Sequence, residues 1–171
     1  MMKRMLPITI SLILALSVVV FAIVTQDATV KGLRITSESD GVTLKIKQKS
    51  DPSLSDTVDL GADLTLKPCS YEDGVFYDGR GNVVTNNPDY VKQVQIQVMT
   101  DAKCNVYATK KVTGTIPIGV VCEQKAIDTD TEVTMVQSIS TLTFYAYVDA
   151  ENYTANGTAD VEVVLHGEPI E

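Results

Sequence analysis

The chain has 171 residues, a formal net charge of −8 and a sequence pI of about 4.6. This acidic balance argues against a nucleic-acid partner, which would need clustered Lys and Arg, and against a polybasic membrane-surface patch. With residues 1–26 set aside, the remaining length suits one domain with one core. Val, Thr and Tyr are plentiful and Trp is absent, a composition that favours pleated, half-buried strands.

The first predicted element is an apolar helix within residues 1–26. Lys3 and Arg4 precede residues 6–24, which carry no charge. As a helix, this run would be about 28 Å long, enough to cross the hydrocarbon of a membrane. Because the positive charges come first, we expect everything after Val24 to be exported. The residues expected to face lipid or a filament core are Leu6, Ile10, Leu14, Val18 and Phe21.

Two fates of this helix remain open. Val20-Phe21-Ala22 places small residues where a signal peptidase could cut, which would release the chain after Ala22. The apolar run is longer than the ~7 to 15 residues usual in a signal, and this length favours a retained segment. Both fates predict a location at the cell surface or outside the cell.

Residues 27–171 are predicted to form one domain, an antiparallel β-sandwich of about eight or nine short strands. Apolar and polar residues alternate in four clear segments, 42–47, 94–98, 141–148 and 160–165. Each alternation predicts a strand with one buried and one solvated face. Weaker strand patterns occupy 29–36, 57–66, 103–110 and 115–122. We expect no amphipathic helix of ten residues after residue 26.

Residues 70–90 form the longest stretch without a strand pattern. The motif DGRGN at 78–82 predicts the tip of a small hairpin that pairs 75–77 with 83–85. A long region of this kind is either a binding loop or a solvated insertion, and both interpretations remain open.

The three cysteines of an exported chain predict a disulfide. If 103–111 and 115–123 form a hairpin, Cys104 and Cys122 lie opposite each other on apolar faces, at a spacing that suits a bridge. We therefore favour the Cys104–Cys122 pair, and Cys69 paired with either of them is the alternative. The cysteine left over is expected to be buried, with a link between subunits as the other interpretation.

Catalytic and metal-binding groups are scarce. His166 is the one imidazole and lies near the end of the chain, so it is interpreted as a solvated residue. Asp128, Asp130 and Glu132 alternate as the acids of a calcium loop do, without the Gly and the distant Glu of an EF-hand. They are weak calcium candidates, and an acidic turn facing water is the favoured interpretation. We expect no cofactor, no metal and no enzymatic activity.

The junction VFAIVTQDATVKGLRITSESDGVTLKI, residues 20–46, runs from the apolar segment straight into a strand pattern. This layout resembles that of TasA- and camelysin-like fibre proteins of prokaryotic surfaces. The resemblance implies a non-enzymatic fibre or matrix subunit whose N-terminal strand completes the sheet of the next subunit. The residues that it places in this assembly strand are Ala28, Thr29, Val30, Lys31, Gly32, Leu33, Arg34 and Ile35. The layout is also similar to that of type IV pilins, which keep an apolar N-terminal helix in the filament core.

These observations predict an exported structural subunit of a cell-surface fibre, pilus-like filament or extracellular matrix. Its partners would be copies of itself, and residues 6–24 would hold it in the membrane before or after assembly. The alternative is a membrane-tethered binding or adhesion module that uses residues 70–90. Neither function involves nucleic acid.

Overall fold

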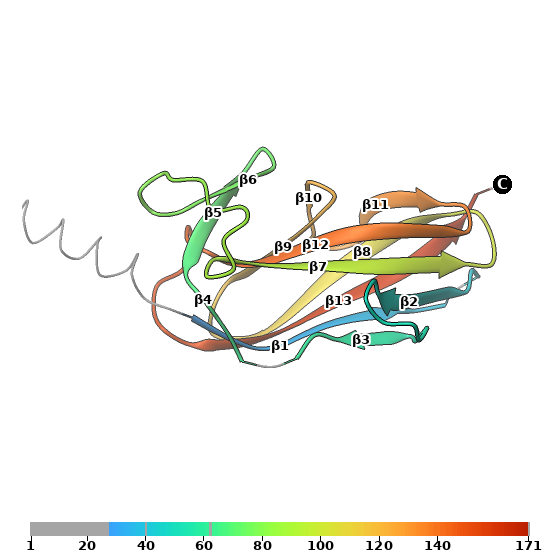
Figure 1. Ribbon diagram of the computed structural model, residues 1–171, viewed down its shortest axis with the longest axis horizontal. Helices are drawn as coiled ribbons and strands as arrows, with labels where there is room; N and C mark the ends of the chain where they lie inside the picture. The colour runs from blue at the N-terminus through green and yellow to red at the C-terminus, as the bar shows by residue number, and fades with distance from the viewer. Residues whose placement is uncertain (1–27, 40, 62, 171) are drawn as a thin grey trace, which may run out of the picture.

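The computed structural model describes residues 28–39, 41–61 and 63–170, and every regular element in this part of the chain is a strand (Figure 1). The all-β prediction is therefore confirmed for these residues, whereas the apolar helix predicted within 1–26 lies outside them. The strands are β1 (Ala28–Ser37), β2 (Leu44–Gln48), β3 (Thr57–Asp59), β4 (Leu64–Leu66), β5 (Pro68–Glu72), β6 (Val75–Tyr77), β7 (Val91–Thr100), β8 (Cys104–Gly114), β9 (Ile118–Cys122), β10 (Lys125–Ala126), β11 (Thr131–Val136), β12 (Ile139–Asp149) and β13 (Thr158–Pro169).

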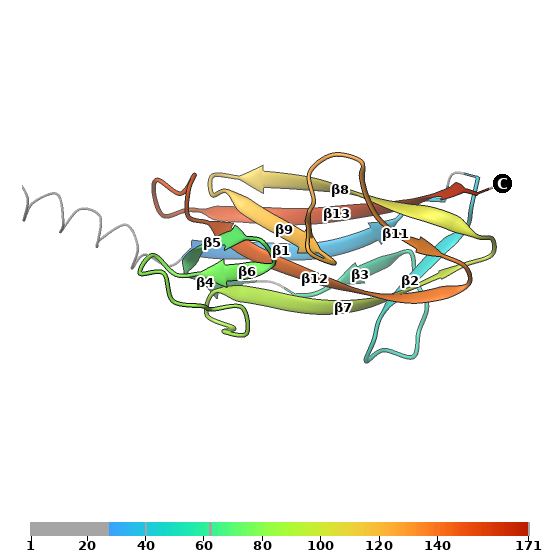
Figure 2. The same cartoon turned by 90° about the horizontal axis from the view of Figure 1, so that it is seen from above.

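The strands form two sheets, here named A and B. Sheet A has the order β11-β8-β13-β1-β3, and β4 pairs with the same edge of β1 as β3 does. Sheet B has the order β10-β9-β12-β5-β6, while β7 pairs with β12 and β2 pairs with β7. Figure 2 shows the long strands of the two sheets running along the same axis of the molecule.

Alternation along the strands gives both sheets an apolar inner face. On β13, Val161, Val163 and Leu165 are buried, and on β12 Leu142 and Phe144 are buried. These side chains belong to one continuous core cluster that draws residues from both sheets. Packing between the sheets therefore follows from the period-two pattern of the sequence.

Three of the clear strand segments, 94–98, 141–148 and 160–165, are confirmed within β7, β12 and β13. The fourth, 42–47, is confirmed from Leu44 onward, where β2 begins, and the weaker one at 29–36 lies within β1. Residues 57–66 contain two short strands, β3 and β4, because the chain turns at Gly61, whose φ is +87°. The strand β11 has no counterpart among the predicted segments.

The prediction of purely antiparallel pairing is wrong at two places. The first strand, β1, pairs with the last, β13, in parallel, and β12 pairs in parallel with β5 at Val148 and Asp149. Parallel neighbours need a long crossover between them, so they join segments that are distant in the chain. Alternation within one segment carries no information about such a partner.

The predicted hairpin between 103–111 and 115–123 is also wrong. Strand β8 pairs with β13 and β11 in sheet A, whereas β9 pairs with β12 and β10 in sheet B. Residues 115–117 therefore carry the chain from one sheet to the other, and they do not close a two-stranded turn.

Candidate assembly site

Residues 28–35, for which we predicted the assembly role, lie within β1, an interior strand of sheet A. Strand β1 pairs along one edge with β13, and along the other edge with β3 and β4. Its inward residues, Ala28, Val30, Leu33 and Ile35, are at most 3 % exposed. Both edges that the assembly hypothesis requires to be available are thus paired within this chain, and the strand fills the slot between β13 and β3.

Strand β1 contains a bulge where it pairs with β13. Its inward residues are spaced by two, three and two positions, because a register shift lies between Val30 and Gly32. Lys31 is the extra residue, and it is exposed. This bulge resets the alternation, so that Leu33 faces the core although it lies an odd number of residues from Val30.

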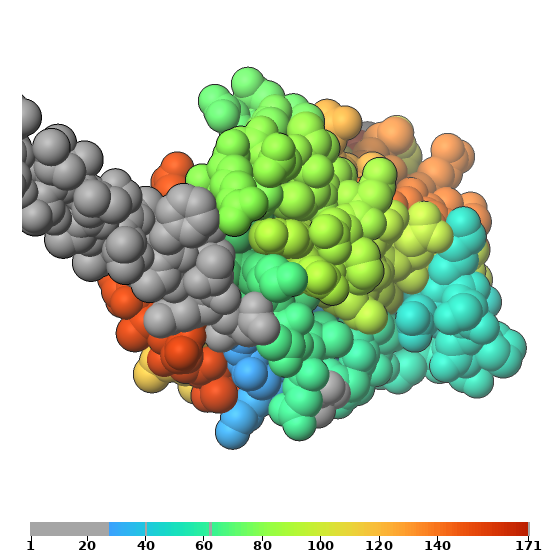
Figure 3. Space-filling model, turned by 60° about the vertical axis from the view of Figure 1, so that its left-hand side comes forward, coloured from blue at the N-terminus to red at the C-terminus, as the bar shows by residue number. Residues whose placement is uncertain are grey.

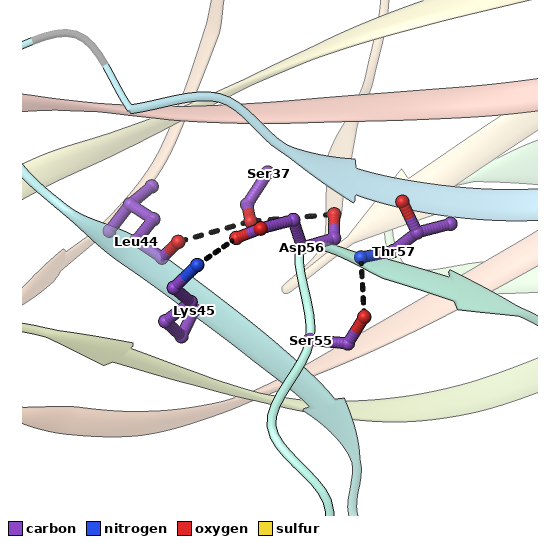
Figure 4. Close-up of polar contacts among 6 residues, drawn as sticks. All are labelled: Ser37, Leu44, Lys45, Ser55, Asp56 and Thr57. Atoms are coloured by element: carbon purple, nitrogen blue, oxygen red, sulfur yellow. Dashed lines mark hydrogen bonds and ion pairs between the residues drawn. The ribbon is translucent and has the colours of Figure 1, made fainter.

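Contacts at the end of β1 hold the strand to its neighbours. The hydroxyl of Ser37 donates to the carbonyl oxygen of Leu44 at 3.1 Å (Figure 4). The backbone N–H of Ser37 donates to the carbonyl oxygen of Asp56 at 2.8 Å. Lys45 Nζ lies 2.6 Å from Asp56 Oδ1, although both side chains are largely exposed. We name Ser37, Leu44, Lys45 and Asp56 the clasp.

Residues 67–90, which include β5 and β6 at the edge of sheet B, fold over the outer face of β9 and β12 and form an outer layer there. Phe76 is 1 % exposed and packs in a second buried cluster, separate from the main core, with Cys69, Val84, Val91 and Val121. In Figure 3 the segment, in green, forms a continuous raised surface. Part of the predicted binding loop is therefore a packed structure with its own small core.

The hairpin predicted at the DGRGN motif is confirmed. Tyr77 and Val83 form an antiparallel bridge, and the N–H of Val84 donates to the carbonyl oxygen of Phe76 at 2.8 Å. The carboxylate of Asp78 accepts bonds from the backbone N–H groups of Arg80 and Asn82, each at 2.9 Å. Hydrogen bonds from Asn82, more than any other interaction, lower the pKa of Asp78, since they favour its charged form.

Tyrosines on β12 explain where this layer sits. Tyr145 and Tyr147 occupy the side of β12 that alternation predicts to be solvated, yet both rings pack against Phe76, with centroids 5.8 Å and 5.1 Å away. Tyr71 packs against Phe76 at 4.9 Å, and its hydroxyl donates to the carbonyl oxygen of Gln124. Two large aromatic residues on a nominally solvated face were the available signal that something covers it.

All three cysteines lie among the described residues, and each is a buried, free thiol. With β8 and β9 in different sheets, the Cys104–Cys122 prediction loses the hairpin on which it rested. Cys69 is buried in the second cluster, where burial, followed by the charge of Asp149, raises its pKa to about 12. Burial also raises the pKa of Cys122. The arrangement favours neutral, unreactive thiols.

The calcium candidates do not converge on one point. The N–H of Asp128 donates to the hydroxyl of Thr131, and the carbonyl oxygen of Glu132 accepts a bond from Lys125. Asp130 Oδ1 lies 3.2 Å from His166 Nε2. Within the described ranges, no group of three or more His, Cys, Asp or Glu side chains could hold a metal ion.

His166 on β13 is positioned by one neighbour on β8 and one in the loop before β11. Its ring stacks on that of Tyr107 on β8, with centroids 5.4 Å apart and an interplanar angle of 14°. Together with the Asp130 contact, this places the predicted solvated histidine in a half-buried position on the outer face of sheet A. Through these contacts, His166 on β13 links β8 and the loop before β11.

The predicted membrane or filament-core residues, 6–24, lie outside the described part of the chain. Among the residues that the structure does describe, none belongs to an apolar helix of membrane-spanning length. No protein-family model matches the chain, and a comparison with curated proteins finds no match.

Proposed function

We propose that the chain is an exported, non-enzymatic structural subunit of a cell-surface fibre, pilus-like filament or extracellular matrix. In this proposal sheets A and B form a β-sandwich, copies of the chain are the partners, and β1 is the strand that passes between them. Residues 6–24 would hold the subunit in a membrane before or after assembly.

The observation that carries the proposal is the place of β1 in the fold. It lies between β13 and β3, yet it joins the rest of the described chain only through residues 38–43. Such a strand can leave its slot without threading past another segment. Exchange of an identical element between copies is a low-cost route to assembly.

The same apolar contacts are available within one chain and between two chains. Burial of the Val30, Leu33 and Ile35 side chains contributes about 1.5–3 kcal/mol each, whichever copy supplies them. If no strand filled the slot, the core residues that face it would be exposed to water. A slot filled by the strand of either copy is therefore strongly favoured over an empty slot. Concentration and the reach of residues 38–43 then decide between the two arrangements.

Opening the clasp is the local step that exchange requires. The Lys45 and Asp56 side chains are 44 % and 58 % exposed, so their ion pair contributes little to stability. The hydrogen bond from Ser37 to Leu44 spans only residues 38–43 and breaks when β1 moves away. These contacts favour the closed form weakly enough for a neighbour to compete.

A cysteine pair across β1 and β3 tests which copy supplies the strand. Thr36 and Thr57 are registered partners, so Thr36→Cys/Thr57→Cys in the full chain should form a disulfide after mild oxidation. Protein isolated from the cell surface should then give a ladder of covalently linked subunits on a non-reducing gel. Neither single-cysteine variant should give such a ladder. A monomer-sized band from filamentous material would overturn strand exchange.

The polymer itself is tested independently of the cysteines. Negative-stain microscopy of native material should show filaments, and sedimentation should show large species at high concentration. Monodisperse monomers at high concentration would exclude the fibre function.

A further inference from the structure

Four charged residues form a row across the outer face of sheet A. Arg34 on β1 is the registered partner of Asp59 on β3 and of Glu162 on β13, and Glu162 is in turn the partner of Lys111 on β8. Signs alternate along this row. Arg34 Nη2 lies 3.6 Å from Asp59 Oδ2. Strand β1 therefore supplies the cation that lies between an acidic residue on β3 and one on β13.

The row lines a shallow depression of about 310 Å³, which Gly32 helps to form. A Cβ at Gly32 would lie 3.0 Å from Asp160 Oδ1, so the backbone of β1 lies close under this carboxylate. The bulge at Lys31 sits directly before it. The charged row and the bulge are therefore adjacent features of one strand.

Together these features select a register. A slip by one residue would turn Val30, Leu33 and Ile35 away from the core. A slip by two would move the bulge and would remove Arg34 from its place between Asp59 and Glu162. An apolar strand without these features could fit the slot in more than one register.

We propose that Arg34 is the residue by which the slot recognises the assembly strand, with the Lys31 bulge fixing its register. The inference rests on the proposed function for its partner, which is β1 of a second copy. The slot thus accepts a strand with a bulge and a cation three residues after it, inserted parallel to β13.

Thermal unfolding of single variants tests recognition without any polymer. Arg34→Glu places like charges next to Asp59 and Glu162. Because the Arg34 and Asp59 side chains are 54 % and 60 % exposed, we expect a melting temperature only about 1–3 °C lower than that of Lys31→Glu. Lys31→Glu is the matched control, because it makes the same charge change on the same strand outside the row. Adding Asp59→Arg and Glu162→Gln to Arg34→Glu should recover most of the loss. Equal melting temperatures for Arg34→Glu and Lys31→Glu would overturn the inference.

Mixing two full-length variants tests recognition between copies. Arg34→Glu has an altered strand and a native slot, whereas Asp59→Arg/Glu162→Gln has a native strand and an altered slot. Within either variant alone the closed monomer and the polymer carry the same mismatch, so each should polymerise about as much as the native chain. An equimolar mixture should polymerise several-fold more, because only junctions between the two variants pair opposite charges. Such a gain supports the inference together with strand exchange. If the triple variant recovers stability and the mixture polymerises no more than either variant alone, strand exchange is overturned while recognition by Arg34 within the chain stands.

Discussion

The ring of Tyr147 lies directly over Gly119, its partner on the neighbouring strand β9, in the space that a side chain at position 119 would occupy. The ring is also held by Phe76 and Tyr71 from the layer above, at centroid distances of 5.1 Å and 6.3 Å. Glycine at 119 is thus required by the packing of the outer aromatic layer.

Gly119→Ala should therefore destabilise the protein by about 1–3 kcal/mol, because the new methyl group overlaps the ring. Urea unfolding measures this loss. In a Tyr147→Leu background the same change should be less destabilising, since the two sites are in contact. Equal losses in both backgrounds would show that the ring is not the obstacle.

Phe76→Ala should loosen residues 67–90 before it affects the main core. Phe76 is the centre of the second cluster, and large-to-small changes of buried aromatics cost about 3–5 kcal/mol. Hydrogen exchange should speed up in β5, β6 and the segment 78–90, while β8 and β13 keep their protection. Tyr77→Ala, on the other side of β6, is the matched control. Uniform loss of protection would contradict an independent layer.

The three thiols should resist alkylation in the folded protein. All three side chains are buried and so shielded from a reagent. Burial also raises the pKa of Cys69 to about 12 and raises that of Cys122, so these two carry little thiolate near neutral pH. At pH 8 an alkylating reagent should leave the native chain unmodified and should modify all three thiols in denaturant. Intact mass counts the added groups. A mass lower by two hydrogens, with one modified thiol, would instead reveal a disulfide.

Stability should fall at high pH as tyrosine ionises. Burial, followed by the charge of Asp149, raises the pKa of Tyr147 from its ordinary value of 10 to about 12. Below pH 10 the phenol is neutral in both the folded and the unfolded chain, so its full contribution to the free energy of unfolding is present. Between pH 10 and pH 12 the unfolded chain loses this proton more readily, so the contribution declines as the pH rises.

Urea midpoints between pH 8 and pH 12 measure this decline. Tyr147→Phe should make the decline shallower while leaving the midpoint at pH 8 nearly unchanged. A Tyr147→Phe profile parallel to that of the native chain would assign the alkaline loss to other groups.

Local alternation predicted strands well and their partners poorly. In 94–98, Val94, Ile96 and Val98 alternate with Gln95 and Gln97, so burial of the apolar face fixes which way each side chain points. The turn at 115–117 looks the same in sequence whether it closes a hairpin or crosses between sheets. For this reason the Cys104–Cys122 prediction lost the hairpin on which it rested.

The sequence of β1 predicts a strand but does not predict that it lies in the interior of a sheet. Its partner β13 lies at the other end of the chain, and nothing in residues 28–35 encodes a parallel neighbour. The row from Asp59 to Lys111 joins four strands in the same way, so it emerges only from the fold. Tyr145 and Tyr147 are a different case, because their size on a nominally solvated face already indicated a covering layer.

The parallel pairing of the first and last strands has a mechanical consequence. Both run in the same direction, so Ala28 lies at one end of the molecule and Ile170 near the other (Figure 1). A force that pulls these two ends apart acts along the strands, in opposite directions on β1 and β13. The hydrogen bonds between them are then loaded together in shear, and they do not open one after another as in a peeled hairpin. A chain held at both ends would resist stretching at the β1–β13 pairing of sheet A.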